Sequence, residues 1–109
     1  MLDQNLLTEF KAIVKGKYAT LIGFFIEDSQ KYIDTILKEV NAGNLHNAAS
    51  AAHTLKSSSR QVGATELGML AEDIEKYSRQ GITPPDAQKK MQDLQEIFTK
   101  TIVALKSTL

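Results

Sequence analysis

The fold is indicated most clearly by residues 17–40, which read KYATLIGFFIEDSQKYIDTILKEV. Apolar side chains recur in this stretch at steps of three and four residues, the spacing that places them on one face of an α-helix. No part of it alternates between apolar and polar residues as a strand would. We therefore expect one long helix with a broad apolar face made of Tyr18, Leu21, Ile22, Phe25, Ile26, Tyr32, Ile33, Ile36, Leu37 and Val40.

The rest of the chain repeats this helical periodicity between clear stop signals. Asp3 suits the N-cap of a short first helix, which Gly16 is expected to break. Two further helices are expected over about residues 45–61 and 64–80, each followed by a glycine. The segment Thr83-Pro84-Pro85-Asp86 predicts the start of a last helix, with a proline at its first helical position.

Short connections between long amphipathic helices favour antiparallel neighbours. The sequence therefore predicts an all-α protein, an antiparallel four-helix bundle with a short additional N-terminal helix. The chain of 109 residues has the length of one domain, over residues 1–109. We expect its core to contain Phe25, Leu55, Ile74 and Phe98.

Composition excludes several classes of function. Thirteen basic and thirteen acidic residues cancel, which argues against nucleic acid or an anionic membrane as the main partner. The chain has no cysteine, no apolar run long enough to span a bilayer, and no signal-peptide pattern in residues 1–4. We expect a cytoplasmic, monomeric protein without membrane insertion. Acidic residues do not cluster around His46 or His53, and no glycine-rich phosphate loop is present, so no metal site, ATP site or other cofactor is expected.

His53 stands apart from the other residues of the helix predicted over residues 45–61. At about 100° per residue, its side chain points about 160° away from the inward direction set by Leu55. Two small residues, Ala49 and Ser57, are expected to flank it and to leave its outer ring nitrogen open. Two cations on the same general side, Lys56 and Arg60, would place positive charge near an anion held on the ring. On geometry alone, a solvated surface histidine is the commoner explanation.

A longer motif around His53 changes that balance. Residues 52–64, AHTLKSSSRQVGA, resemble the signature of histidine phosphotransfer (HPt) domains, A-H-x-L-K-G-S-S-x-x-L-G-A. The likeness continues more weakly through residues 25–28, through residues 42–45, and through Ile74-Glu75 with Arg79. One position departs from the signature, because Ser57 stands where the family usually has glycine. The residues that match in register are Ala52, His53, Leu55, Lys56, Ser58, Ser59, Gly63 and Ala64.

The resemblance implies a role in two-component signal transduction. His53 would accept a phosphoryl group from the phosphoaspartate of a response-regulator receiver domain and pass it to another receiver. Lys56 would steady the phosphoryl oxygens. The receiver would supply Mg²⁺, and a sensor histidine kinase, such as a hybrid kinase, would feed the relay. Such a protein has no kinase activity of its own, and whether it counts as an enzyme stays open.

Four residues are expected to contact the partner, namely Ala49, Ser57, Arg60 and Phe24. For Phe24, a peripheral core position is an equally weighted alternative. Glu75 and Arg79 lie four residues apart and are expected to form a solvated ion pair on the outer face of their helix. The alternative function is a helical interaction module that docks a receiver or kinase without carrying phosphate. Such a module would tolerate His53→Gln, whereas a phosphotransfer domain would lose all relay activity.

Overall fold

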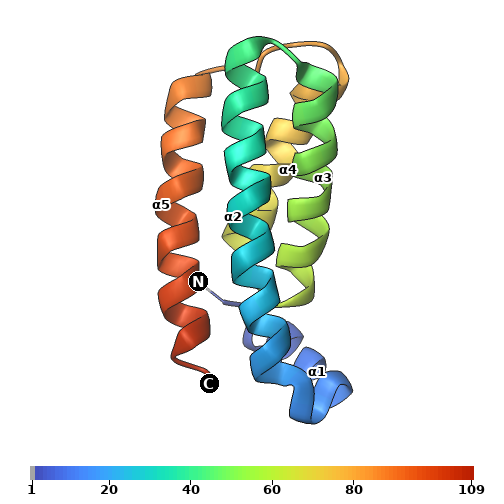
Figure 1. The fold of residues 1–109 in the computed structure, drawn as a ribbon, viewed down its shortest axis with the longest axis vertical. Coiled ribbons are helices and arrows are strands. Elements are labelled where there is room, and N and C mark those ends of the chain that lie inside the picture. Colours follow the sequence, from blue (N-terminus) through green and yellow to red (C-terminus); the bar gives the residue numbers. More distant parts are fainter. Residues whose placement is uncertain (1) are drawn as a thin grey trace.

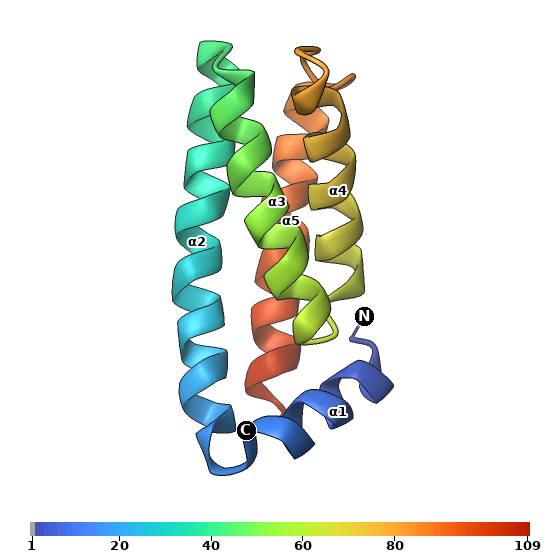
Figure 2. The ribbon, with the colours of Figure 1, turned by 90° about the vertical axis from the view of Figure 1, so that its right-hand side faces the viewer.

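The structure is a computed structural model that describes residues 2–109. The helices over residues 18–42, 45–61, 65–79 and 87–106 run alternately up and down, so each lies antiparallel to the next (Figure 1). The first helix lies across the lower end of the bundle, as Figure 2 shows from the side. Within residues 2–109 there is no strand, only an isolated bridge between Leu2 and Ala64. The elements are α1 (Gln4–Val14), a 3-10 turn (Lys15–Lys17), α2 (Tyr18–Ala42), α3 (Leu45–Gln61), α4 (Thr65–Arg79) and α5 (Ala87–Lys106).

The core follows the apolar stripes that the sequence predicts. The all-α bundle is confirmed, and Phe25, Leu55, Ile74 and Phe98 are all buried in it. On α2, the centre of the stripe is fully enclosed while its edges are half-buried, as expected for a helix with neighbours on one side. Among the described residues, none of the helices is long and apolar enough to cross a membrane.

Close packing between α3 and α4 positions the functional site. The buried face of α3 is rich in alanine, and α4 presents Gly68 to it. A Cβ added at Gly68 would lie 3.4 Å from the Arg60 Cγ and 3.6 Å from the Lys56 carbonyl oxygen. Because small residues allow this approach, polar side chains on one helix can reach those on the other.

The turns agree with the sequence in most places and differ in two. The expected break at Gly16 is a 3-10 turn that begins at Lys15, whose φ is 51°. The two prolines do not begin α5, because Pro84 is buried in the connection and the helix starts at Ala87. The expectation of a proline at the first helical position is therefore wrong. Asp86 precedes the helix with a φ of 52° and makes no side-chain capping bond.

Candidate functional site

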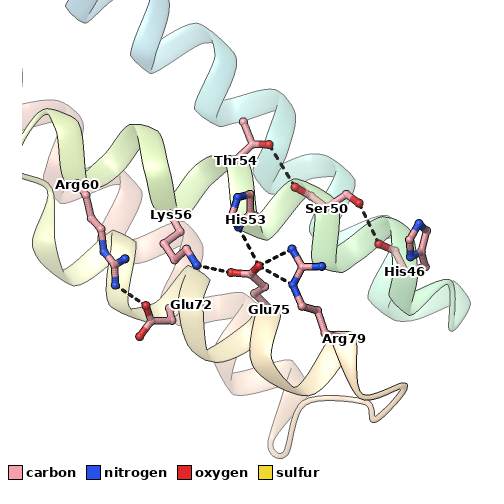
Figure 3. A network of polar contacts seen from close by, with 9 residues as sticks. All are labelled: His46, Ser50, His53, Thr54, Lys56, Arg60, Glu72, Glu75 and Arg79. Carbon is pink, nitrogen blue, oxygen red and sulfur yellow. Dashed lines mark hydrogen bonds and ion pairs between the residues drawn. The ribbon is translucent and has the colours of Figure 1, made fainter.

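His53 lies on the exposed side of α3, and 52% of its side chain is accessible. Its ring does not stand alone, because its Nδ1 lies 2.9 Å from the Oε2 atom of Glu75 on α4 (Figure 3). Glu75 is almost enclosed, with only 7% of its side chain accessible. The site therefore joins an exposed ring to a buried carboxylate on the neighbouring helix.

Two cations also contact the Glu75 carboxylate. Lys56 Nζ lies 2.7 Å from Oε1, while Arg79 places Nε at 2.7 Å and Nη2 at 2.6 Å from Oε2. Burial by itself raises the pKa of the Glu75 carboxyl. The hydrogen bonds from Lys56, Arg79 and His53 outweigh burial and lower this pKa to about 2. Glu75 is therefore an anion at neutral pH.

The ionised state of Glu75 determines which nitrogen of His53 carries the proton. A carboxylate can only accept hydrogen bonds, so the contact requires that His53 Nδ1–H donates to Glu75 Oε2. In a neutral imidazole with its proton on Nδ1, Nε2 holds a free lone pair. The ring nitrogen with the free lone pair is thus the one across the ring from the Glu75 contact, which Figure 3 shows.

Lys56 lies at the site but is already engaged. Only 17% of its side chain is accessible, and its ammonium group is paired with Glu75. The sequence analysis expected Lys56 near His53 but did not predict its ion pair with Glu75. To contact a phosphoryl group on His53, Lys56 would therefore have to leave Glu75 or bind both anions at once.

The four residues expected to face a partner have different environments. Phe24 is 54% accessible, so it is not a peripheral core residue, and Ser57 is exposed. Arg60 is exposed and pairs with Glu72 across the α3–α4 contact. Ala49 is only 1% accessible, so the expectation that it lies open beside the ring is wrong. Its position faces the C-terminal end of α4, where it adjoins Ser78 and Arg79.

Glu75 is the residue of the candidate site that the sequence analysis missed. The expectation of a solvated Glu75–Arg79 pair on the outer face of α4 is wrong, because this side of α4 is turned toward α3. A signal was present in Gly68, which lies seven residues before Glu75 and therefore on the same side of the helix. A glycine within a helix costs stability unless a close neighbour requires it.

Beyond this cluster, the described residues offer little for other chemistry. Within residues 2–109, no group of three or more His, Cys, Asp or Glu side chains is placed to hold a metal ion. A hollow of about 260 Å³ lies where α1, α2 and the end of α3 meet, with apolar walls that include Phe10, Leu21 and Phe25. Ser58 and Gln61 line this hollow and also the shallow surface beside Ser57, so the two are adjacent.

Comparison with known proteins agrees with this arrangement. The family model of the Hpt domain matches residues 20–105. The crystal structure of histidine-containing phosphotransfer protein B (HptB) from Pseudomonas aeruginosa PAO1 has the same fold, with a TM-score of 0.91 at 21% sequence identity. That similarity covers 98% of this chain and 92% of the other. No curated protein matches the chain.

Proposed function

The chain belongs to the Hpt domain family, and on that premise we propose that it carries a phosphoryl group on His53 from one receiver domain to another. The family membership gives histidine phosphotransfer in a phosphorelay as its role. The observation that supports His53 as the carrier is its contact with the ionised Glu75, which leaves Nε2 free. The direction of transfer and the partners are part of the proposal.

The proposed step needs no proton transfer within this chain. The Nε2 lone pair of His53 attacks the phosphorus atom of a receiver phosphoaspartate, and an N–P bond forms. The P–O bond to the aspartate breaks, and its electrons leave with the aspartate carboxylate. Nδ1 keeps its proton throughout, and its N–H group donates a hydrogen bond to Glu75. The reverse of this step loads a second receiver.

Charge neutralisation is shared between the two proteins. Phosphoryl transfer depends mainly on positioning and on cations that balance the charge of the phosphoryl oxygens. We assign Mg²⁺ to the receiver and the cation from this chain to Lys56, which lies one turn after His53 on α3. This chain is not expected to bind ATP or a metal, so a sensor kinase has to supply the relay through a receiver.

The docking surface is assigned to exposed side chains of α2 and α3. Ser57 lies one turn from His53 on α3, Arg60 follows at the next turn, and Phe24 offers exposed apolar surface on α2. Aromatic residues and arginine are enriched at protein interfaces. Ala49 is no longer included because it is buried. We keep the expectation of a cytoplasmic monomer as part of this proposal.

The test is phosphoryl transfer from a purified receiver. The chain is incubated with a phosphorylated receiver and Mg²⁺, and mass spectrometry at neutral to basic pH locates the phosphate. We expect phosphate on His53 both in the unchanged protein and in His46→Gln. We expect no phosphate anywhere on His53→Gln. Phosphate on His46, or a His53→Gln protein that still accepts phosphate, would contradict the proposal. A protein that binds the receiver but is never labelled would instead be the interaction module described above.

A further inference from the structure

The two oxygens of the Glu75 carboxylate have different partners. Oε1 contacts Lys56 Nζ at 2.7 Å. Oε2 contacts His53 Nδ1 at 2.9 Å and both Arg79 nitrogens at 2.6–2.7 Å. The link between His53 and Glu75 therefore shares an oxygen with Arg79 and none with Lys56. Lys56 can leave the carboxylate without breaking the contact that orients the ring.

The two cations also differ in how they are held. Lys56 extends from α3, and its ammonium is a compact charge on a flexible stem with three rotatable donors. Arg79 lies four residues after Glu75 on the same helix, and its planar fork places two N–H groups on one oxygen. Movement of Lys56 toward a new anion on α3 leaves the Arg79 contact in place. The geometry thus allows Lys56 to leave Glu75 while Arg79 stays, even though the Lys56 side chain is 17% accessible and that of Arg79 is 54% accessible.

A phosphoryl group on His53 would change the charge at this site. It would bring negative charge close to an anion that is only 7% accessible, and the repulsion between the two is strong at such positions. If Lys56 turns from Oε1 to the phosphoryl oxygens, Glu75 loses one of its two cationic side chains. This loss coincides with the arrival of the negative phosphoryl group. Arg79 is then the one cationic side chain left on Glu75, beside the Nδ1–H group of the phosphorylated ring.

We propose that Arg79 is a positioning residue, which holds Glu75 on His53 Nδ1 in the phosphorylated state while Lys56 moves to the phosphoryl group. Arg79 acts through Glu75 and does not itself contact the reacting nitrogen. This inference rests on the proposed function, since it concerns the protein with phosphate on His53. It predicts that loss of Arg79 has little effect on the free ring and a large effect on the phosphorylated one.

The experiment compares Arg79→Gln with the unchanged protein before and after labelling. Phosphoramidate serves as the phosphoryl donor, so that no receiver is needed; its P–N bond breaks and ammonia leaves. NMR of ¹⁵N-histidine protein reports the His53 tautomer and the exchange rate of the Nδ1 proton with water. Lys90→Gln is the control, because Lys90 also pairs with a carboxylate of α4, at 2.9 Å from Asp73, but lies outside the cluster around Glu75.

We expect Arg79→Gln to keep the Nδ1–H tautomer before labelling, because Lys56 still pairs with Glu75. After labelling, its Nδ1 proton should exchange about tenfold faster than in the unchanged protein, the effect of one lost hydrogen bond to a charged group. Arg79→Lys keeps the charge with a single donor group and should lie between the two. Lys90→Gln should match the unchanged protein in both states. In unchanged protein that carries ¹⁵N-lysine, the Lys56 ammonium signal should shift on phosphorylation.

Several results would overturn the inference. Equal Nδ1 proton exchange in labelled Arg79→Gln and labelled unchanged protein would show that Arg79 does not hold Glu75. An unshifted Lys56 signal on labelling would show that Lys56 does not move. Circular dichroism of each variant excludes unfolding as the cause of a difference. Absence of phosphate on His53 in the unchanged protein would instead overturn the proposed function, and the inference with it.

Discussion

Two ion-pair regions join α3 to α4, and they differ in burial. Around Glu75, a carboxylate with 7% accessibility takes hydrogen bonds from His53, Lys56 and Arg79. Toward the other end of the same contact, Arg60 and Glu72 pair with about half of each side chain accessible. A buried anion must be compensated by several donors, whereas an exposed pair exchanges its partners for water at little cost. Only the first region can orient a functional side chain.

Removal of the buried anion should have the largest effect. Glu75→Gln leaves Lys56 and Arg79 as cations without a counter-charge and gives His53 no anionic acceptor. We expect a loss of about 3 kcal/mol in the free energy of unfolding, the lower end of what breaking a buried pair costs, because both cations can still reach water. Phosphoryl transfer should fall at least about tenfold, since Nδ1 loses a charge-assisted bond. Urea unfolding and labelling kinetics measure the two effects, and unchanged values in both would remove the distinction between the regions.

Acid should destabilise the protein through the same residue. The pKa of Glu75 in the folded protein is about 2, below its usual value of 4.5, so folding favours the ionised form. The stabilisation is complete well above pH 4.5 and is lost as the pH falls from 4.5 toward 2. Unfolding measured across this range should show a steeper loss in the unchanged protein than in Glu75→Gln. Parallel curves for the two proteins would show that other carboxylates carry the effect.

Lys56→Ala should separate catalytic from structural effects within the buried region. Glu75 keeps its bonds from Arg79 and His53, so the bundle should remain folded. Transfer should slow, or the phosphohistidine should hydrolyse faster, by about tenfold, because one charge-assisted hydrogen bond to the phosphoryl group is lost. Time courses of labelling and of phosphate loss measure this. Rates equal to those of the unchanged protein would limit Lys56 to holding Glu75.

Ser57→Gly concerns the exposed stretch of α3 between the two regions. Glycine restores the family signature and leaves more room beside the ring, so transfer should be equal or slightly faster while the fold is kept. A mid-helix glycine should cost about 0.5–1 kcal/mol of stability. Ser57→Gln is the informative counterpart, since its longer side chain should cover the ring and block transfer from a receiver. Normal transfer by Ser57→Gln would show that this stripe of α3 is not the contact face.

Removal of the exposed pair should have the smallest effect on stability. Glu72→Gln should change the free energy of unfolding by less than about 1 kcal/mol, as exposed ion pairs usually do. Labelling by phosphoramidate should be unchanged, because Glu72 contacts none of the groups bound to Glu75. A loss comparable to that of Glu75→Gln would mean that burial does not distinguish the two regions.

The comparison also explains what could be predicted from the sequence. The regular spacing of the apolar residues in 17–40 was sufficient to predict the long helix α2. The helix expected over residues 45–61 has the bounds of α3. On α4, the apolar residues Leu70 and Tyr77 are half-buried, while Gly68, Glu75 and Ser78 on the other side are enclosed. Helical periodicity reports the average apolar direction of one helix. It does not report how closely a second helix approaches a polar side.

Ala49 was mispredicted for the same reason. Its angle on α3 places it near His53, but its exposure depends on the end of α4, which covers it. His53 is exposed, as its angle on α3 predicts, although its ring touches Glu75 on α4. Features determined by one helix were therefore predictable, and those determined by the α3–α4 distance required the structure.

The turn at Gly63 has a consequence for the order in which the chain assembles. Its φ is +76°, and a Cβ there would lie 2.6 Å from the Asp3 carbonyl oxygen, while Asp3 N–H donates to the Gly63 oxygen at 2.7 Å. The N-terminal segment thus docks on a loop that exists only once α3 and α4 have paired. Contacts across such a sequence separation form late. In native-state hydrogen exchange, α1 should open as a separate unit, well before α3 and α4 lose their protection.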